Sequence, residues 1–313
     1  MNILITGIHG FVGSNLTKAL SPGNSIFGLD IVFPFNEGNI KTYPWSNLEK
    51  KILPEVDVII HLAGKAHDTK NQSEAQSYFD INTELTKRIL DYFLSTSAKK
   101  FIFFSSVKAV ADTVDGAFLT EEVVPNPKGP YGESKVLAEK YIQENWPAQN
   151  SDKSVFILRP CMIHGPGNKG NLNLLYKVVN KRIPWPLGAF DNRRSFTSID
   201  NLCFVIDRLI SENSRPGVYH IADDEPLSTN ELIQVICETM GRKARIWYLP
   251  QKLMNGVARL GGLLHLPLNE ERLHKLTENY VVSNAKIKEA LGIKRMPVSA
   301  KEGLRRTIKA FKK

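Results

Sequence analysis

Cysteine is scarce in this 313-residue chain, and long apolar runs are missing. The three cysteines, Cys161, Cys203 and Cys237, are odd in number and scattered, so we expect reduced thiols, no disulfide framework and no metal site. No apolar run approaches the roughly 18 residues of a membrane-spanning helix. Because the first apolar run begins at residue 2, we expect no signal peptide and a cytoplasmic location.

Repeats and low-complexity linkers are also missing, so no such segment divides the chain. A chain of 313 residues is long enough to bury a sizeable core. We therefore expect one large domain or two smaller ones.

Glycine is concentrated where the chain leaves its first apolar run. Residues 2–6 are of β type, and residues 7–13 follow with a G-x-x-G-x-x-G pattern that opens into a helical stretch at 14–20. Gly7, Gly10 and Gly13 permit a tight turn and let the backbone approach a pyrophosphate at the helix N-terminus. The pattern predicts a dinucleotide-binding turn, which includes Phe11 and Val12.

An acidic residue stands near the distance that such a turn requires. Asp30 closes a second strand-like run, residues 25–31, at a position close to the roughly 20 residues expected for the carboxylate that binds the adenosine ribose. A carboxylate there would repel a 2′-phosphate, and residues 31–33 offer no arginine to hold one. The sequence therefore favours NAD over NADP. The alternative interpretation is an aspartate of a strand-end turn.

Apolar runs and helical stretches alternate along the rest of the chain. Strand-like runs cover residues 56–64, 101–106, 154–158 and 217–222, and helical stretches cover 81–95 and 132–145. This alternation predicts an α/β fold with a doubly wound parallel sheet and helices on both faces. Ligands bind such sheets at the carboxyl ends of the strands, where Gly7, Asp30, Ala63 and Ser106 fall.

A Tyr-x-x-x-Lys pair follows downstream of Ser106. In a helix, the spacing of Tyr131 and Lys135 places both side chains on one face. An ammonium beside a phenol favours the phenolate and lowers the pKa of the tyrosine, which suits acid/base catalysis. The alternative is a pair that occurs by chance on a surface helix.

In combination, these motifs resemble the extended short-chain dehydrogenase/reductase family, and within it the UDP-glucose 4-epimerase-like nucleotide-sugar epimerases and the 4-ketoreductases. The resemblance covers nearly the whole chain and implies a Rossmann-type sheet with a smaller α/β C-terminal substrate-binding domain. It rests on residues 6–13, Asp30, Asp57 with residues 61–63, Ser105 and Ser106, residues 131–135, Arg159 and Pro160 with residues 165–167, and residues 193–196.

The resemblance also implies roles for single residues. Asp57 is implied to contact the adenine, Asn82 to support the active-site strand end, and Ser106 to hydrogen-bond the reacting sugar hydroxyl. Lys135 is implied to hold the nicotinamide ribose as well. The implied cofactor-binding residues are Gly7, Gly10, Phe11, Val12, Gly13, Asp30, Asp57, Leu62, Ala63, Gly64, Lys65, Asn82, Ser105, Tyr131, Lys135 and Pro160.

The implied substrate-binding residues are Ser106, Lys108, Asn171 and Arg194. In the resembling enzymes, Asn171 and Arg194 correspond to residues that hold the diphosphate of a UDP-sugar, and guanidinium binds phosphate in a bidentate manner. For Arg194 and its neighbour Arg193, the alternative is an exposed cationic turn. Trp185 either walls the nucleotide pocket or anchors local packing.

Two departures from the family patterns bear on which reaction this chain catalyses. Sugar 4,6-dehydratases carry Thr-Asp-Glu where this chain has Ser106, Val107 and Lys108, so the acid and base for elimination of water are missing. This pattern favours members that only move hydride at a sugar carbon. His164 stands where many relatives have tyrosine, and we interpret it as a packed or hydrogen-bonded loop residue.

The implied reaction is hydride transfer at sugar C4. Tyr131 takes the proton of the 4-hydroxyl, Ser106 orients that oxygen, and Lys135 with the oxidised nicotinamide keeps the pKa of the tyrosine low. An epimerase of a UDP-hexose or UDP-N-acetylhexosamine returns the hydride through a 4-keto intermediate. A 4-reductase of a UDP-4-keto-6-deoxy sugar in surface polysaccharide precursor synthesis consumes NADH or NADPH. The same residues serve both reactions.

We predict two domains. Residues 1–164, with a returning segment at about 198–222, form the NAD-binding domain. Residues 165–197 and 223–313 form the nucleotide-sugar-binding domain. The resemblance implies a homodimer.

The net charge of +9 is concentrated near the C-terminus. Residues 271–313 hold twelve Lys or Arg and four Glu, while Leu304, Ile308 and Phe311 share one helical face. We expect this helix to pack on its own domain, and docking on an anionic membrane is the alternative. No nucleic-acid-binding motif or aromatic platform accompanies the charge, so we expect no nucleic-acid partner.

A function of another class also stays open. The glycine turn would suffice for a catalytically silent NAD-binding sensor or scaffold. The presence of Ser106, Tyr131 and Lys135 argues for an enzyme, because a scaffold has no need of all three.

Overall fold

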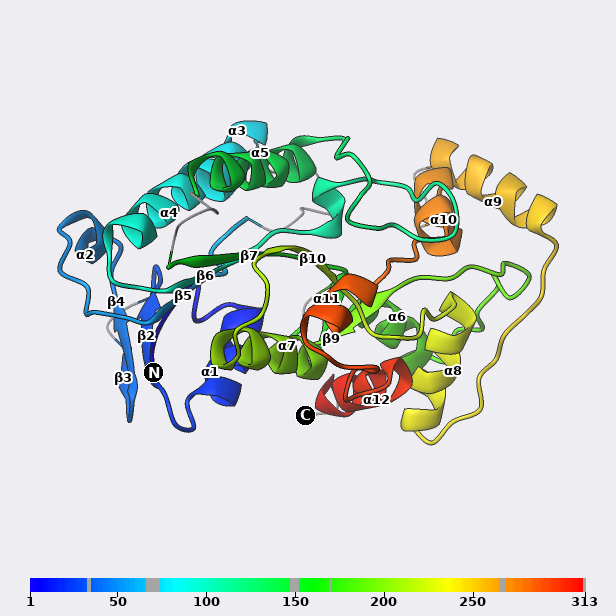
Figure 1. Cartoon of the computed structure of the whole chain (residues 1–313). Helices are drawn as coiled ribbons and strands as arrows, with labels where there is room; N and C mark the ends of the chain where they lie inside the picture. Colours follow the sequence, from blue (N-terminus) through cyan, green and yellow to red (C-terminus); the bar gives the residue numbers. More distant parts are fainter. Residues whose placement is uncertain (33–34, 66–73, 147–151, 169, 265–267, 312–313) are drawn as a thin grey trace.

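A parallel sheet lies at the centre of the protein. The computed structural model describes residues 1–32, 35–65, 74–146, 152–168, 170–264 and 268–311, and it leaves the side chains of residues 35–37 and 171 undescribed. Figure 1 shows the sheet between two layers of helices. The strand order is β10-β7-β6-β5-β1-β2-β4-β3, and every neighbouring pair is parallel except β3 and β4. The strands are β1 (Asn2–Thr6), β2 (Ser25–Leu29), β3 (Phe35–Glu37), β4 (Ile40–Tyr43), β5 (Val58–His61), β6 (Lys100–Phe104), β7 (Ser154–Pro160) and β10 (Gly217–Ile221).

The order confirms the doubly wound sheet that the sequence predicts. The predicted runs at 2–6, 25–31, 56–64, 101–106, 154–158 and 217–222 become β1, β2, β5, β6, β7 and β10. The edge strands β3 and β4 were not predicted, because they are short and polar residues interrupt their apolar pattern.

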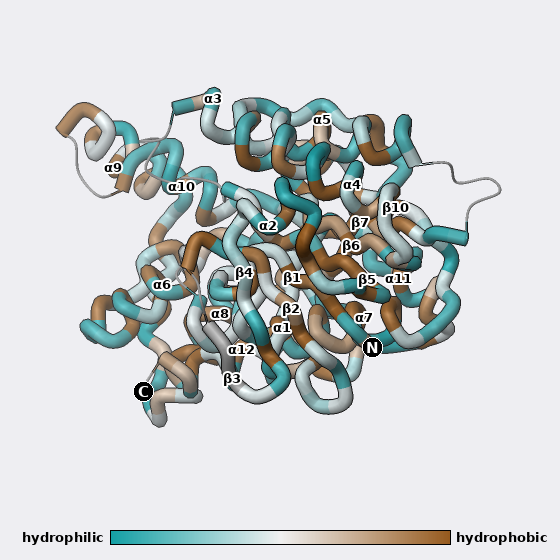
Figure 2. The backbone as a smooth tube through the Cα atoms, turned by 90° about the vertical axis from the view of Figure 1, so that its left-hand side faces the viewer, coloured by the Kyte–Doolittle hydropathy of each residue, from teal (hydrophilic) through white to brown (hydrophobic). Residues whose placement is uncertain are grey.

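Helices cover both faces of the sheet. On one face, Ile3 and Ile5 of β1 pack in a cluster with residues of α1 (Phe11–Leu20) and α7 (Ile199–Ser211). On the other face, Leu4 packs with residues of α4 (Leu85–Ser95) and α5 (Pro130–Asn145). Successive β1 side chains therefore face opposite layers, which explains why these strands are apolar throughout. Figure 2 shows these apolar strands between the two helix layers.

Short elements fill the connections of the sheet. They are α2 (Ser46–Glu49), α3 (Ala75–Tyr78), the π-helix η1 (Phe79–Glu84) and the 3₁₀-helix η2 (Val107–Ala109). The helix predicted at 81–95 thus begins within a π-turn and continues as α4. Mid-helix π-turns are rare and occur at functional sites.

A second apolar cluster lies beside the sheet. It joins Trp185, Phe196 and Leu232 with residues of the helices around a two-stranded parallel sheet. The elements are β8 (Met162–His164), β9 (Phe196–Ser198), α6 (Asn171–Asn180), α8 (Thr229–Thr239), α9 (Gln251–Leu263), α10 (Glu270–Thr277), α11 (Ala285–Ala290) and α12 (Ala300–Phe311). Ile287 of α11 packs in the first cluster with the large sheet.

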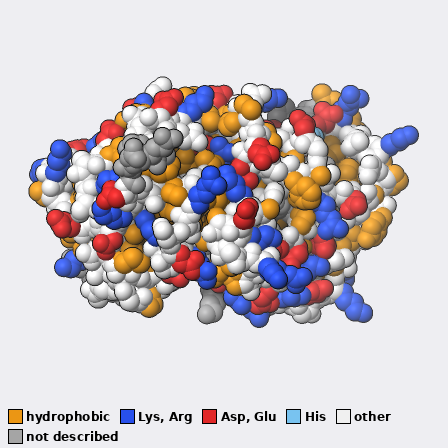
Figure 3. All heavy atoms as spheres, viewed as in Figure 1, with side chains coloured by type: hydrophobic (Ala, Val, Ile, Leu, Met, Phe, Trp, Pro, Cys, Tyr) orange, Lys and Arg blue, Asp and Glu red, His pale blue; other side chains and the backbone are white. Residues whose placement is uncertain are grey.

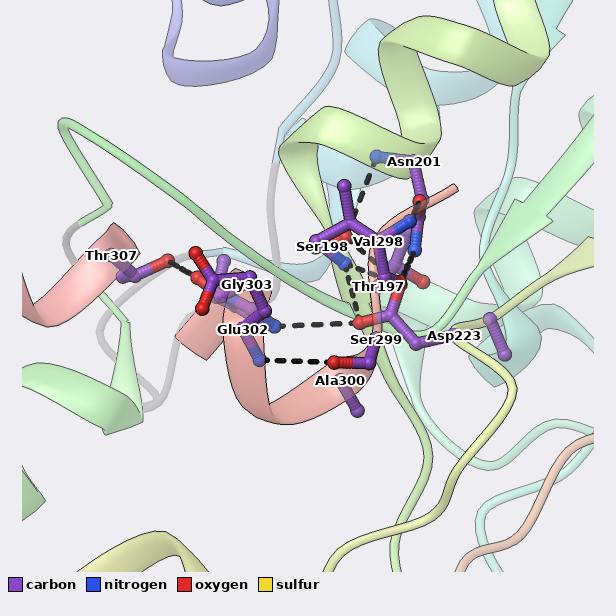
Figure 4. Close-up of polar contacts among 12 residues, drawn as sticks. Thr197, Ser198, Asn201, Asp223, Val298, Ser299, Ala300, Glu302, Gly303 and Thr307 are labelled. Atoms are coloured by element: carbon purple, nitrogen blue, oxygen red, sulfur yellow. Dashed lines mark hydrogen bonds and ion pairs between the residues drawn. The ribbon is translucent and has the colours of Figure 1, made fainter. Parts of the chain in front are cut away.

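Asp223 connects the two parts of the protein. Its carboxylate accepts hydrogen bonds from the backbone and hydroxyl of Ser198 and from the Asn201 amide. Asn201 in turn donates to the carbonyl of Val298 at 2.7 Å and accepts from its N–H at 3.0 Å. Figure 4 shows this network at the start of α12, where Gly303 lies close to Ser198. The network joins the end of β10 to α7 and α12.

The basic C-terminal helix packs on the protein itself. Leu304 and Ile308 of α12 are 1 % and 0 % exposed and lie in the cluster that contains residues of α8. The apolar face of α12 is therefore buried, which confirms the expected packing and excludes this face as a membrane contact. Figure 3 shows Lys and Arg side chains gathered at the lower right, where α12 lies in Figure 1. Across the described residues, no helix has both the length and the apolar character to cross a membrane.

Candidate active site

The candidate site lies at the carboxyl ends of the central strands. The chain runs outward from β1 through β2 to β4 and then returns to β5 on the other side of β1. This change of direction separates the connections that follow β1 and β5, and ligands of doubly wound sheets bind at that point. Gly7 follows β1 and Ala63 follows β5 at this edge.

The glycine turn after β1 is tight and open to a ligand. Gly7 has φ 72°, and its N–H donates to the Leu29 carbonyl at 2.8 Å. A Cβ on Gly13 would lie 2.3 Å from the Gly7 oxygen, so no larger residue fits there. Helix α1 begins at Phe11 without a capping side chain or an acidic residue in its first turn. This leaves backbone N–H groups for an anion such as a pyrophosphate.

Asp30 lies beside this turn. Its carboxylate accepts from the His9 N–H at 2.9 Å and from the Ile31 N–H at 2.7 Å. The bond to His9 draws Asp30 toward the glycine turn across 21 positions of sequence. The position fits a carboxylate that faces the ribose of a dinucleotide bound along the turn.

The segment after β5 is held by Asn82 of η1. The Asn82 side chain accepts from the Lys65 N–H at 2.8 Å and donates to the Lys65 carbonyl at 3.1 Å and to the Ser134 hydroxyl at 3.0 Å. A Cβ on Gly64 would lie 2.9 Å from the Asn82 oxygen. Asn82 thus ties the strand end to helix α5, which agrees with the supporting position expected of it.

His61 beneath this segment belongs to a family motif, but no role was predicted for it. It is 1 % exposed, and its ring nitrogens bond the hydroxyls of Thr6 at 2.7 Å and Thr86 at 2.9 Å. Burial, assisted by the Lys135 ammonium, lowers the pKa of His61 to about 3. The neutral ring therefore joins β1, β5 and α4. The Thr6 hydroxyl also accepts from the Ala63 N–H at 3.0 Å.

Ser106, Tyr131 and Lys135 come together at the ends of β6 and α5. The side chains of Ser106 and Tyr131 are hydrogen-bonded to each other. Lys135, one turn along α5, donates to the Phe104 carbonyl at 2.7 Å. Helix α5 begins at Pro130, which suits the first helical position. The predicted catalytic residues therefore share one site.

Burial shifts the pKa values of two of the predicted catalytic residues. Burial raises the pKa of Tyr131, and the hydrogen bond from Ser106 opposes that rise only in part. Burial also lowers the pKa of Lys135 to about 8, while Glu139 acts in the opposite direction. The lowering expected from Lys135 together with the oxidised nicotinamide would have to overcome this effect of burial on the pKa of Tyr131.

A buried ion pair beneath the site was also missed. Glu139 and Arg159 are 1 % and 4 % exposed, and Arg159 Nε donates to the Glu139 carboxylate at 3.0 and 3.1 Å. The Ser105 hydroxyl donates to the same carboxylate. The i, i+4 spacing of Lys135 and Glu139 was visible in the sequence, but the pairing with Arg159 needs the neighbouring strand.

Of two predicted substrate residues, Lys108 of η2 adjoins the catalytic group, and Arg194 lies just before β9 in the second part of the protein. The backbone N–H of Lys108 donates to the Ser106 hydroxyl at 3.2 Å. The Lys108 ammonium lies 4.5 Å from the centre of the Tyr280 ring. Arg194 lies 3.4 Å from the Glu278 carboxylate and donates to the Lys275 carbonyl. Burial lowers the pKa values of both cations. Tyr280 itself was not singled out in the sequence.

The other predicted residues are placed as follows. Phe11, Val12 and Leu62 are partly buried near the glycine turn, and Pro160 is buried at the end of β7. The side chain of Asn171 lies outside the described part of the structure, although α6 begins at this residue. Arg193 points away from Arg194 and lies 3.6 Å from Glu231.

The structure corrects the prediction for Asp57. Asp57 lies at the amino end of β5, where its carboxylate accepts from the Asn2 N–H at 2.7 Å. The four residues of β5 span roughly 13 Å and separate Asp57 from the edge that carries Ala63. This position does not fit a contact with a cofactor at the carboxyl ends. Asp57 ties the start of β5 to the start of β1.

His164 and Trp185 are structural residues. His164 is 2 % exposed and bonds the Thr307 hydroxyl at 2.9 Å, as the interpretation of a hydrogen-bonded residue requires. Trp185 is 6 % exposed and belongs to the second apolar cluster. It borders a hollow of about 430 Å³ between α6 and α8. Among the described residues, no group of three or more His, Cys, Asp or Glu side chains could hold a metal ion.

Comparisons with known proteins identify the family. Residues 3–222 match the NAD dependent epimerase/dehydratase family. The chain is 31 % identical to the UDP-glucose 4-epimerase of Vibrio cholerae, covering 99 % of this chain and 95 % of that protein. It is 26 % identical to the N-acetyl-alpha-D-glucosaminyl-diphospho-ditrans,octacis-undecaprenol 4-epimerase of Escherichia coli O157:H7, with 92 % and 85 % covered.

The fold matches solved structures as well. The UDP-glucose 4-epimerase of Thermotoga maritima with UDP-glucose superposes with a TM-score of 0.77 at 22 % identity, covering 100 % of this chain and 99 % of that one. The sheet and this match confirm the predicted Rossmann-type fold, and the match to the NAD dependent family confirms the NAD cofactor. The protein thus belongs to the NAD-dependent epimerase/dehydratase family and is an enzyme of that family.

Proposed function

We propose that this enzyme interconverts the C4 epimers of a UDP-linked hexose or N-acetylhexosamine. The observation that carries the proposal is the hydrogen-bonded pair of Ser106 and Tyr131 with Lys135 one helical turn away. The site has Lys108 where a dehydratase would need a carboxylate, which supports a reaction confined to C4. The similarity to a UDP-glucose 4-epimerase over 99 % of the chain supports epimerisation.

In this proposal, the residues of the chain transfer one proton and hold the reacting groups in position. Tyr131 takes the proton of the 4-hydroxyl and returns it, Ser106 orients that oxygen, and Lys135 holds the ribose beside the catalytic group. When bound, NAD supplies the acceptor for the hydride of C4 and an added positive charge near the phenol. Because burial raises the pKa of Tyr131, we expect that charge to be required for proton transfer.

The binding roles follow the same geometry. The residues proposed to hold NAD are those of the glycine turn with Asp30, the segment 62–65, Asn82 and Ser105, together with Pro160. Lys108, Asn171 and Arg194 are proposed to hold the substrate. We propose that residues 1–164 and 198–222 serve the cofactor, and that 165–197 and 223–313 serve the nucleotide sugar. The two apolar clusters support this division except at Ile287, Leu291 and Met296, which pack with the large sheet, and the homodimer stays a prediction.

A lipid-linked diphosphate sugar is a second candidate substrate. The Escherichia coli relative is named for a substrate of this kind. Here, Leu253 and Leu260 of α9 are 53 % and 60 % exposed, so the proposed substrate domain carries exposed apolar surface. Both substrates would present a diphosphate to Arg194. They differ in the group on the other side of the diphosphate, which is uridine in one and a lipid in the other.

Proton NMR of the enzyme with NAD tests the proposal. UDP-glucose, UDP-galactose and their N-acetylhexosamine counterparts are supplied one at a time, with a polyprenyl diphosphate N-acetylglucosamine as a fifth substrate. Appearance of the C4 epimer without accumulated NADH establishes an epimerase and names its sugar. If no epimer forms from any of the five, the proposal fails and the 4-ketoreductase becomes the better assignment.

Tyr131→Phe tests the proton step. We expect turnover to fall by roughly 10²–10⁴-fold, because the general acid/base is lost. NAD binding, measured by calorimetry, should be retained. Tyr141→Phe on the same helix is the matched control, since its hydroxyl bonds Asp91 on an exposed face. Equal turnover in both variants would contradict the role of Tyr131.

A further inference from the structure

Helix α9 exposes an apolar stripe. Leu253, Val257, Leu260 and Leu264 are 53 %, 43 %, 60 % and 67 % exposed. Their spacing of four, three and four residues places them on one face of the helix and its C-terminal end. Met254 on the adjacent face is 4 % exposed and anchors the helix. Figure 1 shows α9 at the outer edge of the molecule, next to α10, and Figure 2 shows its apolar ends in brown.

Basic and aromatic residues border this stripe. Residues 239–269 contain no Asp or Glu and five Lys or Arg, of which two lie on α9 and the other three line the hollow between α6 and α8. Lys252 and Arg259, seven residues apart, lie on one side of α9 and flank the stripe. Trp247 and Tyr248, just before the helix, are 55 % and 69 % exposed.

The acidic residues near α9 belong to α10 and are already paired. Glu270 lies 3.7 Å from Arg259, and Glu271 lies 2.6 Å from Lys275. Across α9 and α10, four Lys or Arg stand against two Glu, which leaves a net charge of +2. A net positive surface remains around the apolar stripe.

We infer that α9 docks on an anionic membrane surface. An apolar stripe bordered by Lys and Arg is typical of helices that lie in the interface plane, with their apolar face among the acyl chains. The cations face lipid phosphates, and Trp247 and Tyr248 have the amphipathic rings that favour the headgroup level. A second copy of the chain is the weaker occupant, because the same basic surface would face itself.

Helix α9 lies close to Arg194, which is proposed to bind the substrate. α9 packs on α10, and the Lys275 carbonyl of α10 accepts a hydrogen bond from Arg194. Docking through α9 therefore brings the proposed diphosphate-binding residue near the membrane surface. The inference concerns a surface rather than the reaction, so it stands or falls independently of the proposed epimerase activity.

Sedimentation of the full chain with vesicles tests the inference. We expect binding to vesicles of phosphatidylglycerol and phosphatidylcholine, little binding to phosphatidylcholine alone, and weaker binding as salt is raised. Leu253→Glu with Leu260→Glu should reduce the partition coefficient at least about tenfold, because it places charge in the stripe. Both positions are exposed, so the thermal midpoint should not change.

The matched control is Val124→Glu with Leu174→Glu. These residues are 82 % and 61 % exposed and lie outside α9, so the pair makes the same chemical change elsewhere. A second pair tests charge: Lys252→Glu with Arg259→Glu should weaken binding, whereas Lys309→Glu with Lys294→Glu should not. On vesicles, the emission of Trp247 should shift to the blue, and Trp247→Phe should remove the shift.

Several outcomes would overturn the inference. One is a wild-type chain that does not sediment with phosphatidylglycerol vesicles. Another is an equal loss in the α9 variant and its control. A third is a change from dimer to monomer in the α9 variant without a change in vesicle binding, which would assign the stripe to a second copy. NMR turnover of all variants on UDP-sugars should remain, which separates this test from that of the epimerase.

Discussion

The Lys135 ammonium lies where a charge is costly. It is 6 % exposed, 5.0 Å from the centre of the Phe103 ring, and its main partner is the Phe104 carbonyl. Burial lowers its pKa to about 8 from the ordinary 10.5. Between these values the unfolded chain binds the proton and the folded protein does not, so stability rises with pH in that window.

Lys135→Met should therefore raise the free energy of unfolding at pH 7 while abolishing turnover. The gain should shrink between pH 8 and about 10, by up to about 1.4 kcal/mol per pH unit. Urea denaturation over that pH range measures it. Lys140→Met, at an exposed position of the same helix, is the control and should show a flat difference. A gain for Lys135→Met that does not vary with pH would argue against the lowered pKa.

Glu139 is the carboxylate that accepts hydrogen bonds from the buried Arg159 guanidinium. Glu139→Gln leaves the guanidinium buried without a counter-charge, so we expect a loss of about 3–5 kcal/mol in the free energy of unfolding. Chemical denaturation checks this value. Glu144→Gln near the end of the same helix is exposed and should change stability by no more than about 0.5 kcal/mol. Similar losses in the two variants would refute the importance of the buried pair.

At the scale of elements, two helical glycines differ in what surrounds them. A Cβ on Gly303 of α12 would lie 2.6 Å from the Ser198 Cβ, whereas a Cβ on Gly256 of α9 meets nothing within 4 Å. We expect Gly303→Ala to destabilise the protein by about 1–3 kcal/mol, because α12 must move away from β9. Gly256→Ala should stabilise it by about 0.5–1 kcal/mol through helix propensity. Thermal unfolding of the two variants measures both effects, and equal shifts would contradict the close packing of α12.

Helices α9 and α12 each carry an apolar stripe, and the fold buries only one of the two stripes. The stripe of α12 was recognised in the sequence, and the fold buries it against the second apolar cluster. The stripe of α9 was not recognised, and the fold leaves it exposed. Periodicity shows that a face exists, but only packing shows whether another element covers it.

For the molecule as a whole, the three cysteines should stay reduced and slow to react. Burial raises the pKa values of Cys161, Cys203 and Cys237, that of Cys203 to about 12, so little thiolate forms near neutral pH. Titration with an aromatic disulfide reagent should be slow for the native protein and should reach three thiols after unfolding. Reductant should not change the thermal midpoint. Rapid native labelling would contradict the burial of these thiols.

Local patterns were sufficient for the large sheet and for most of its carboxyl edge. The strands and the glycine turn are encoded in neighbouring residues, and parallel strands bring Gly7, Ala63 and Ser106 to one edge whatever the details of packing. The same logic failed for Asp57, because a motif position does not say at which end of its strand a residue lies. It also missed Glu139, His61 and Tyr280, whose partners come from distant elements.

By itself, the sequence determined the fold class through local periodicity and the pairing of Tyr131 with Lys135 through spacing within one helix, and its motifs together indicated the family. The tertiary structure alone decided how these groups are charged and which surfaces remain open. Burial raises the pKa of Tyr131 and lowers that of Lys135, and burial is a property of everything packed around a group. For the same reason, only the packed molecule distinguishes the covered helix α12 from the exposed helix α9.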